Sequence, residues 1–441
     1  MNPKKFYGKL EPEKVILWGF LMLIMSGTLL LWISNYSYKP LTFIDSLFTA
    51  TSAVCVTGLV VVDTASDLTF YSKSIVAVLI QLGGLGVMTA FTFLFILRGA
   101  RVSLQQRYYL SNSLGLESVS GVIRLLGHIV KMTLAIELFG TLLLFGKLID
   151  YYEPLSALGH ATFQSVSAFC NAGFSTFPGN MMPFSKDIYL TSVIMILIVL
   201  GGIGFVPLTE IVGVEKRGKR LSPYCKMVLI MTVMLIVLGC IFLFLSEHCR
   251  SNQQISVFQG FWDALFQSVS ARTAGFNTVD IGKVSPLGSF ILILLMIVGA
   301  SPGSTGGGMK TTTLGVLLLS LYSEILQRED VVFFGRRVPY SVLRKAVSLA
   351  IVYVMTIFLS SFIMGFMEPY SFREILFEVT SALGTVGLST GITPKLSTGS
   401  KLLLILLMFW GRVGLIIFFY GIARKEEKGR VTYADVNVPI G

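Results

Sequence analysis

Four short stretches of this chain repeat one pattern of small residues. Each holds a Ser-Ala pair and then reaches a glycine followed by Leu or Phe; the pairs begin at Ser52, Ser167, Ser270 and Ser381. The four glycines are Gly58, Gly173, Gly275 and Gly387. A glycine accepts backbone angles that a Cβ disfavours, so it can turn successive peptide carbonyls in one direction. Because carbonyl oxygens can replace the hydration water of a cation, the chemistry that this pattern favours is cation binding by the backbone.

A single glycine of this kind would be interpreted as the C-cap of a short helix. Four glycines in equivalent places, each after a segment that contains Ser-Ala, favour a shared role instead. We therefore predict that three backbone positions in each stretch line one ion path, namely Val56, Thr57, Gly58, Asn171, Ala172, Gly173, Thr273, Ala274, Gly275, Thr385, Val386 and Gly387.

A second unusual segment, residues 299–313, reads GASPGSTGGGMKTTT and interrupts a long apolar stretch. A helix is not sustained there, because the segment contains Pro302 and the glycines Gly303, Gly306, Gly307 and Gly308. Its polar side chains, Lys310 included, would be stranded in lipid, so we expect them to line the ion path. The competing interpretation is a phosphate-binding loop, but Met309 stands where that motif has its lysine and no strand precedes it.

Three further charged residues are predicted at membrane depth, where charges are rare and usually face a cavity or a partner group. Arg412 lies at the depth of the 299–313 segment, and we expect it to hydrogen-bond carbonyls of residues 300–310. A purely structural bond between helices is the alternative. Arg272 precedes Gly275 by three residues; we expect it to point behind the ion path, with Glu378 as a candidate partner. Glu137 is left with two interpretations, a pair with Lys131 or a contact with a partner subunit.

The composition explains what positions these residues. The 441 residues are 54% hydrophobic and 13% charged, with a mean hydropathy of +0.76, whereas a soluble domain carries about 25% charged residues. Eight stretches are long enough to cross a membrane as helices, at residues 15–34, 74–97, 128–149, 188–212, 227–246, 287–323, 346–366 and 402–423. The four Ser-Ala segments fall between them and are too short to cross, which indicates re-entrant segments.

Charge predicts the orientation in a cell membrane. With both termini in the cytoplasm, 23 of the 35 Lys and Arg residues fall in inner segments and nine in outer ones, as the positive-inside rule expects. The net charge of +11 is therefore attributed to inner loops beside anionic lipid rather than to nucleic-acid binding. Five cysteines and three histidines show no metal-ligand spacing, and no acid–base pair emerges in the apolar stretches, so neither a metal site nor an enzyme is predicted.

The predicted fold is an all-α membrane protein of four repeats, each built from a helix, a re-entrant pore loop and a second helix. It has eight transmembrane helices and four re-entrant pore helices in a pseudo-fourfold arrangement. Small residues recur in the second helices at Gly83-Gly84, Gly201-Gly202, Gly299-Ala300 and Gly411-Arg412, where we expect them to permit close helix approach. The predicted segments are a cytoplasmic N-terminus (1–13), the repeats 14–100, 101–215, 216–325 and 326–425, and a cytoplasmic tail (426–441).

Together, the stretches VCVTGL, FCNAGF, ARTAGF and GTVGLST, the loop GASPGSTGGGMKTTT and the arginine in FWGRVG resemble the Trk/Ktr/HKT superfamily of potassium transporters. The resemblance covers about residues 14–425 and is strongest to its KtrB-type membrane subunits. It implies a K+ uptake function, with a filter of one glycine per repeat. It also implies that the 299–313 loop acts as an intramembrane gate, for which we select Gly303, Gly306, Gly307, Gly308, Lys310 and Arg412.

The same resemblance implies the partners. It predicts a homodimer with one pore per subunit, on a cytosolic ring of nucleotide-binding regulatory subunits of the KtrA type. K+ is the transported ion, Na+ is a candidate stimulator, and no cofactor is expected in this chain. An alternating-access secondary cation transporter, coupled to Na+ or H+, is the alternative function, but such proteins typically have two inverted repeats.

Overall fold

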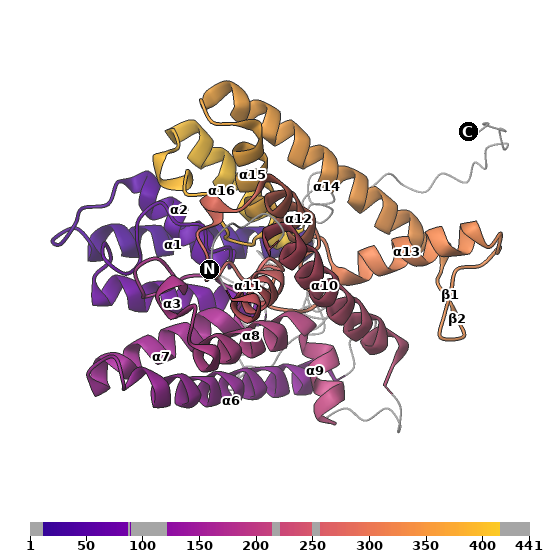
Figure 1. Ribbon diagram of the computed structural model, residues 1–441, viewed down its shortest axis with the longest axis horizontal. Helices are drawn as coiled ribbons and strands as arrows, with labels where there is room; N and C mark the ends of the chain where they lie inside the picture. Colours follow the sequence, from indigo (N-terminus) through magenta and orange to yellow (C-terminus); the bar gives the residue numbers. More distant parts are fainter. Residues whose placement is uncertain (1–11, 87–88, 90–120, 214–220, 249–255, 415–441) are drawn as a thin grey trace, which may run out of the picture.

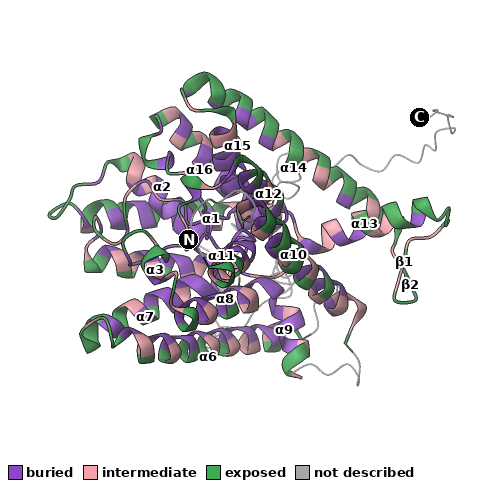
Figure 2. Ribbon diagram, viewed as in Figure 1, coloured by how far each residue is buried: buried purple, intermediate pink, exposed green. Residues whose placement is uncertain are grey.

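The computed structural model describes residues 12–86, 89, 121–213, 221–248 and 256–414. Four long helices form the outside of the molecule: α1 (Pro12–Ser34), α6 (Val122–Leu148), α10 (Pro223–His248) and α14 (Tyr340–Met367). Each is long and apolar enough to cross a membrane. Their outward faces carry exposed apolar side chains, such as Phe362 (63% exposed) and Phe366 (78% exposed) on α14. Figure 2 shows these exposed faces along α6, α10 and α14, around a buried interior.

Four short helices lie inside this layer at the predicted re-entrant segments: α2 (Phe43–Val54), α7 (Pro154–Phe169), α11 (Val257–Ser270) and α15 (Phe372–Gly384). Their starts are set by local caps. Thr42 and Ser256 accept hydrogen bonds from the backbone N–H three residues on, and Ser371 forms a reciprocal capping box with Glu374. The last turns of all four are buried, so the short helices run from the surface into the centre.

Within the described residues, the second helix of each predicted repeat consists of one or two short helices, and it is interrupted in the second and third repeats. These helices are α3 (Phe70–Gly84), α8 (Ile188–Ile203) followed by α9 (Phe205–Val212), α12 (Pro286–Ile297) followed by α13 (Thr311–Ile325), and α16 (Thr398–Val413). The sequence predicted an interruption in the third repeat alone, and that expectation was too narrow. Gly86, Gly204 and Gly414 adopt φ values of 83°, 101° and 96°, which end a right-handed helix. At Gly204 the axis bends by 104°.

The number of described helices that are long enough to cross a membrane therefore differs from the number of apolar stretches, which is eight. Among the described residues, four helices are long and apolar enough to cross a membrane, or five if α8 and α9 form one span. The stretches expected at 74–97 and 402–423 continue into residues outside the described part of the chain.

The remaining elements of the described residues are small and lie in the connections. Among them are three single-turn 3-10 helices at Met182–Phe184, Ile281–Lys283 and Thr393–Lys395. A two-stranded antiparallel hairpin, β1 (Val332–Phe333) and β2 (Arg336–Arg337), pairs Val332 with Arg337 and follows α13. In Figure 1 the end of α13 and the hairpin project from the body of the molecule.

The helices pack in a closed cycle that follows the order of the chain. The second helix of each predicted repeat contacts the short helix of the next: α3 packs on α7, α8 on α11, α12 on α15, and α16 on α2 (Figure 1). At the closing contact, Lys401 of α16 forms an ion pair with Asp45 of α2 at 2.9 Å, with both side chains less than 20% exposed. The four units thus surround one centre.

Within each unit, a glycine of the second helix lies against the end of the short helix. A Cβ on Gly83, Gly201 or Gly411 would collide with the carbonyl oxygen of Val54, Phe169 or Leu383, respectively. These contacts agree with the expected role of the small residues in close packing. In the third unit the equivalent Gly299 instead meets the carbonyl of Gly307 in the loop.

We expect Gly201→Ala to lower the thermal stability of the purified protein markedly, because the new methyl group cannot avoid the Phe169 carbonyl. Overpacking of this kind typically costs about 1–3 kcal/mol. Gly146→Ala in α6 is the matched control, because a Cβ at Gly146 meets nothing within 4 Å. That change is expected to leave stability unchanged or to raise it slightly. Equal melting temperatures for the two variants in detergent would contradict this packing.

Candidate functional site

The four predicted ion-path segments share one unusual backbone conformation. In each, a residue two before the glycine has a positive φ: 57° at Val56, 58° at Asn171, 75° at Thr273 and 49° at Thr385. The glycines follow with φ values of 88° at Gly58, 69° at Gly173, 75° at Gly275 and 92° at Gly387. Left-handed φ at a non-glycine residue costs energy and persists where surrounding structure enforces it. All twelve predicted ion-path residues are buried.

These four glycines face one another around a common centre. A Cβ built on Gly58 would lie 3.0 Å from the Cα of Gly173, one on Gly173 would lie 3.0 Å from that of Gly275, and one on Gly275 would lie 3.2 Å from that of Gly387. The cycle closes, because a Cβ on Gly387 would lie 2.9 Å from the Cα of Gly58. We call these four residues the glycine ring.

Carbonyl oxygens fill the gaps between neighbouring glycines of the ring. The oxygen of Ala172 lies against Gly58, that of Ala274 against Gly173, that of Val386 against Gly275 and that of Thr57 against Gly387. Four segments up to 329 positions apart in the chain therefore bring equivalent peptide groups together. This arrangement can present a set of inward oxygens to a desolvated cation.

The repeated serine of each short helix supports its own segment of the ring. Ser52 and Ser381 accept hydrogen bonds from the backbone N–H of Gly58 and Gly387, at 3.0 Å and 3.1 Å. Ser167 instead donates to the carbonyl of Phe174 at 2.7 Å, and Ser270 donates to that of Phe276. All four serines are fully buried. The pairs were visible in the sequence, but this supporting role was not predicted.

We expect Ser381→Ala to weaken the discrimination of the protein between K+ and Na+. The change leaves the Gly387 N–H buried without its partner, a cost of about 1–3 kcal/mol, so the strained turn is held less firmly. Competition of Na+ with Rb+ uptake measures the effect. Ser26→Ala on the exposed face of α1 removes a similar hydroxyl far from the ring; if both variants discriminate equally, the supporting role is wrong.

The segment between α12 and α13, residues 298–310, lies against one side of the ring. Gly307 donates its N–H to Thr385 Oγ1 at 3.1 Å, and a Cβ on Gly306 would collide with Thr273 Oγ1. The loop is also tied to the second helices, because Ser301 N–H donates to Gly202 O at 3.0 Å and Gly308 N–H to Gly411 O at 3.3 Å.

Five of the six predicted gate residues belong to this loop, and each is fixed by a contact. Gly303 accepts from the Phe205 N–H at 2.8 Å. The Lys310 ammonium folds back and donates to the carbonyl oxygens of Gly306, at 2.8 Å, and Gly307, at 3.3 Å. The loop is therefore a hydrogen-bonded segment that lies against the ring at Thr273 and Thr385.

Arg412, the sixth predicted gate residue, joins three parts of the molecule. Its guanidinium donates to the carbonyl oxygen of Thr305 in the loop and to those of Gly83 and Gly84 at the end of α3, the last at 3.2 Å. The contact with residues 300–310 was expected from the sequence, and the contact with α3 was not. One cation on α16 thus holds the loop against the opposite side of the helix cycle.

The expected pair of Arg272 and Glu378 is absent, and that expectation was wrong. Arg272 is 6% exposed and extends to Thr232 of α10, where it donates to the carbonyl oxygen at 3.2 Å and to Oγ1 at 3.5 Å. It does point behind the ring, as predicted. Glu378 is satisfied by residues 389–393 instead.

Glu137 does not pair with Lys131. Its side chain is 5% exposed and lies in the contact between the first two units, with Oε1 3.8 Å from the Cys170 sulfur. The Cys170 sulfur also lies 3.7 Å from Oε1 of Gln81 in α3. The other expectation for Glu137, a contact with a partner subunit, is not favoured by this burial inside the chain.

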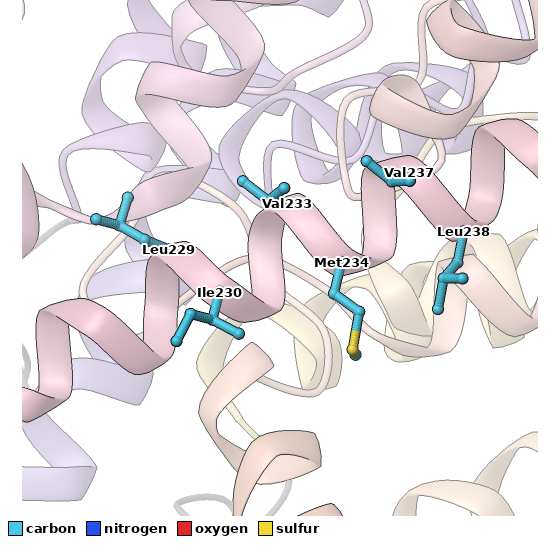
Figure 3. A pocket seen from close by; sticks show the side chains of 6 residues that line it. All are labelled: Leu229, Ile230, Val233, Met234, Val237 and Leu238. Atoms are coloured by element: carbon cyan, nitrogen blue, oxygen red, sulfur yellow. The ribbon is translucent and has the colours of Figure 1, made fainter. Parts of the chain in front are cut away.

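No cofactor or metal site stands out in the part of the chain that the structure describes. No group of three or more His, Cys, Asp or Glu side chains is placed to hold a metal ion there. An open apolar groove of about 550 Å³ runs along one face of α10 (Figure 3), lined by Leu229, Ile230, Val233, Met234, Val237 and Leu238. A groove without polar groups on a membrane-length helix suits lipid chains rather than a polar ligand.

Comparison with known proteins adds an independent line of evidence. The family model TrkH, described as a cation transport protein, matches residues 14–423. The chain is 35% identical over 435 residues to the Ktr system potassium uptake protein B of Bacillus subtilis, covering 98% of this chain and 97% of that protein. It is also 35% identical over 444 residues to protein D of the same system and organism, covering 99% of both.

A solved structure agrees with the arrangement of the helices. The crystal structure of the potassium transporter TrkH from Vibrio parahaemolyticus superimposes with a TM-score of 0.77, covering 96% of this chain and 87% of that one. The two sequences are 18% identical, so this match supports the fold alone.

Proposed function

Because the chain belongs to the TrkH family of cation transport proteins, we propose that it is the ion-conducting membrane subunit of a potassium uptake system. Two similar proteins are named as potassium uptake proteins of the Ktr system. The observation that carries the proposal is the glycine ring, in which four backbone segments place their peptide oxygens around one centre. A dehydrated K+ requires such oxygens in place of its water.

In this proposal the chain comprises four repeats with the boundaries predicted above, and the ring is the selectivity filter. The ion path continues from the ring to the 298–310 loop, which closes it as a gate. Both proposals rest on position, because the loop contacts Thr273 and Thr385 within the ring segments and Arg412 anchors it. In this proposal, conduction requires that the loop move away from Thr273 and Thr385.

The proposed assembly is a homodimer on a cytosolic ring of KtrA-type subunits that bind nucleotide. The word "system" in the names of the similar proteins implies a partner subunit. The inner loops carry most of the Lys and Arg residues, which supports cytoplasmic termini in the cell membrane. Na+ is proposed as a stimulator of uptake.

Transport by the purified protein tests the function directly. Proteoliposomes loaded with K+ are expected to accumulate external 86Rb+ through this chain, and Na+ is expected to compete weakly. Flux that exceeds typical carrier rates, without a requirement for an H+ or Na+ gradient, would separate this function from an alternating-access transporter. Vesicles that take up no more Rb+ than protein-free vesicles, with or without the regulatory partner, would exclude the proposed function.

A further inference from the structure

At one helical position behind the glycine ring, the residue type differs between the four repeats, and the proposed function does not explain this difference. The position lies three residues before each repeated serine and holds Thr49, Gln164, Gln267 and Glu378. In two repeats its side chain reaches the hydroxyl group two residues after the ring glycine. Gln164 Nε2 donates to Ser175 Oγ at 2.6 Å, and Ser389 Oγ donates to Glu378 Oε1 at 2.7 Å. The contact is equivalent, but one side chain is neutral and the other is a carboxylate.

The side chain of Glu378 is surrounded by hydrogen-bond donors. It is fully buried, and both of its oxygens accept hydrogen bonds. The donors are Ser389 Oγ, the N–H of Thr390 at 2.8 Å, Thr390 Oγ1 at 3.0 Å and Thr393 Oγ1 at 2.6 Å. Four donors stabilise the charged form of a carboxylate. Within the described residues no Lys or Arg forms an ion pair with it, so a negative charge on this side chain is stabilised by these four donors and not by a cation.

This charge lies close to the ring, on the side away from the loop. The loop contacts Thr385, two residues before Gly387, whereas Glu378 holds Ser389, two residues after it. Two residues of chain span at most about 7 Å, and the Ser389 side chain and its hydrogen bond extend this further, so the carboxylate lies within about 12 Å of the ring glycine. A buried charge at that distance acts through protein rather than through water and is screened weakly.

We propose that Glu378 is an ionised positioning residue, whose unpaired charge raises the affinity of the ring for the entering cation and holds the 387–393 turn in place. The proposal rests on the proposed function of the ring as a K+ filter. It makes the fourth repeat electrostatically distinct from the second, in which Gln164 provides the same tie without charge. Glu378 acts through the field and through Ser389, and it does not itself touch the ion.

The test is Glu378→Gln, which keeps the shape and removes the charge. We expect the KM for Rb+ uptake to rise by about tenfold, with the maximal rate close to that of the wild type. Glu378→Asp keeps the charge and is expected to retain a KM nearer the wild-type value. A fall in maximal rate with an unchanged KM would indicate a purely structural role and would overturn the proposal.

The reciprocal change, Gln164→Glu, gives a matched variant at the equivalent place. Alone it is expected to lower the KM for Rb+, and combined with Glu378→Gln it is expected to restore the KM partly. If Glu378→Gln does not fold, the single Gln164→Glu variant decides the question, since an unchanged KM overturns the proposal. Failure of the proposed function is distinguishable, because the wild-type protein would then show no Rb+ uptake at all.

Discussion

Serine in place of any ring glycine, at Gly58, Gly173, Gly275 or Gly387, is expected to abolish selective K+ uptake. Each position has a φ between 69° and 92°, which a side chain tolerates poorly. The strain alone is worth about 1–3 kcal/mol, which corresponds to about 5- to 150-fold in an equilibrium. The added Cβ also meets the backbone of the neighbouring repeat at 3.3 Å or less. Because that neighbour is itself part of the ring, one change displaces oxygens of two repeats.

The measurement is growth and 86Rb+ uptake at low external K+ in a bacterium that lacks its own K+ uptake systems. Gly159→Ser in α7, the short helix that precedes Gly173, is the control for Gly173→Ser, because a Cβ at Gly159 has open space around it. Membrane abundance of each variant must match that of the wild type. Four ring variants that retain normal K+ over Na+ selectivity would remove the basis for a carbonyl filter.

Removal of Arg412 is expected to produce the second large effect, a rise in ion flux that no longer responds to the regulatory subunit. In Arg412→Ala the loop loses its cationic tie to Thr305 and, through it, its connection to α3. A hydrogen bond to a charged group contributes about 1.5–3 kcal/mol. If that energy favours the closed loop, basal flux rises by about 10- to 150-fold. The change also removes a positive charge from the proposed ion path.

Flux through proteoliposomes, with and without nucleotide-bound partner subunits, measures this effect. Arg412→Lys separates charge from geometry, because lysine keeps the cation but loses the planar guanidinium that contacts three carbonyls at once. It is expected to give an intermediate flux. Lys401→Ala, on the same helix but in the ion pair with Asp45, controls for general damage to α16. An Arg412→Ala protein with wild-type flux and regulation would rule out a gating role for the hydrogen bond between Arg412 and Thr305.

The parts of the site that sequence could predict were those specified by local residue types. Glycine and the Ser-Ala pairs located the four short segments, because their conformational demands act within a few residues. Pro302 and its glycines located the interruption before α13 for the same reason. The helical, membrane-protein character of the fold followed from the long apolar stretches.

Features that depend on helix rotation or on distant partners were not predictable in the same way. Arg272 was expected near Glu378, but from the turn after α11 it reaches Thr232 of α10 instead. The break at Gly204 was hidden, because one glycine in an apolar stretch also suits close helix packing. The hydrogen bonds by which Ser52 and Ser167 support the ring could not be predicted either. Predicting them requires knowing how the chain folds back on the short helix after its last turn. A single sequence does not contain that information.

The ion pair of Asp45 and Lys401 joins residues 356 positions apart. Since α2 has α16 as its neighbour, the first quarter of the protein acquires its final surroundings after the last quarter has been synthesised and inserted. Until the last quarter has been synthesised, the chain therefore holds only three of the four ring segments, and the ring is incomplete. Biogenesis must protect these polar turns from lipid until the final helix arrives. Because the N-terminal and C-terminal quarters are neighbours in space, a circularly permuted gene that begins at another inter-repeat loop would preserve every contact of the ring.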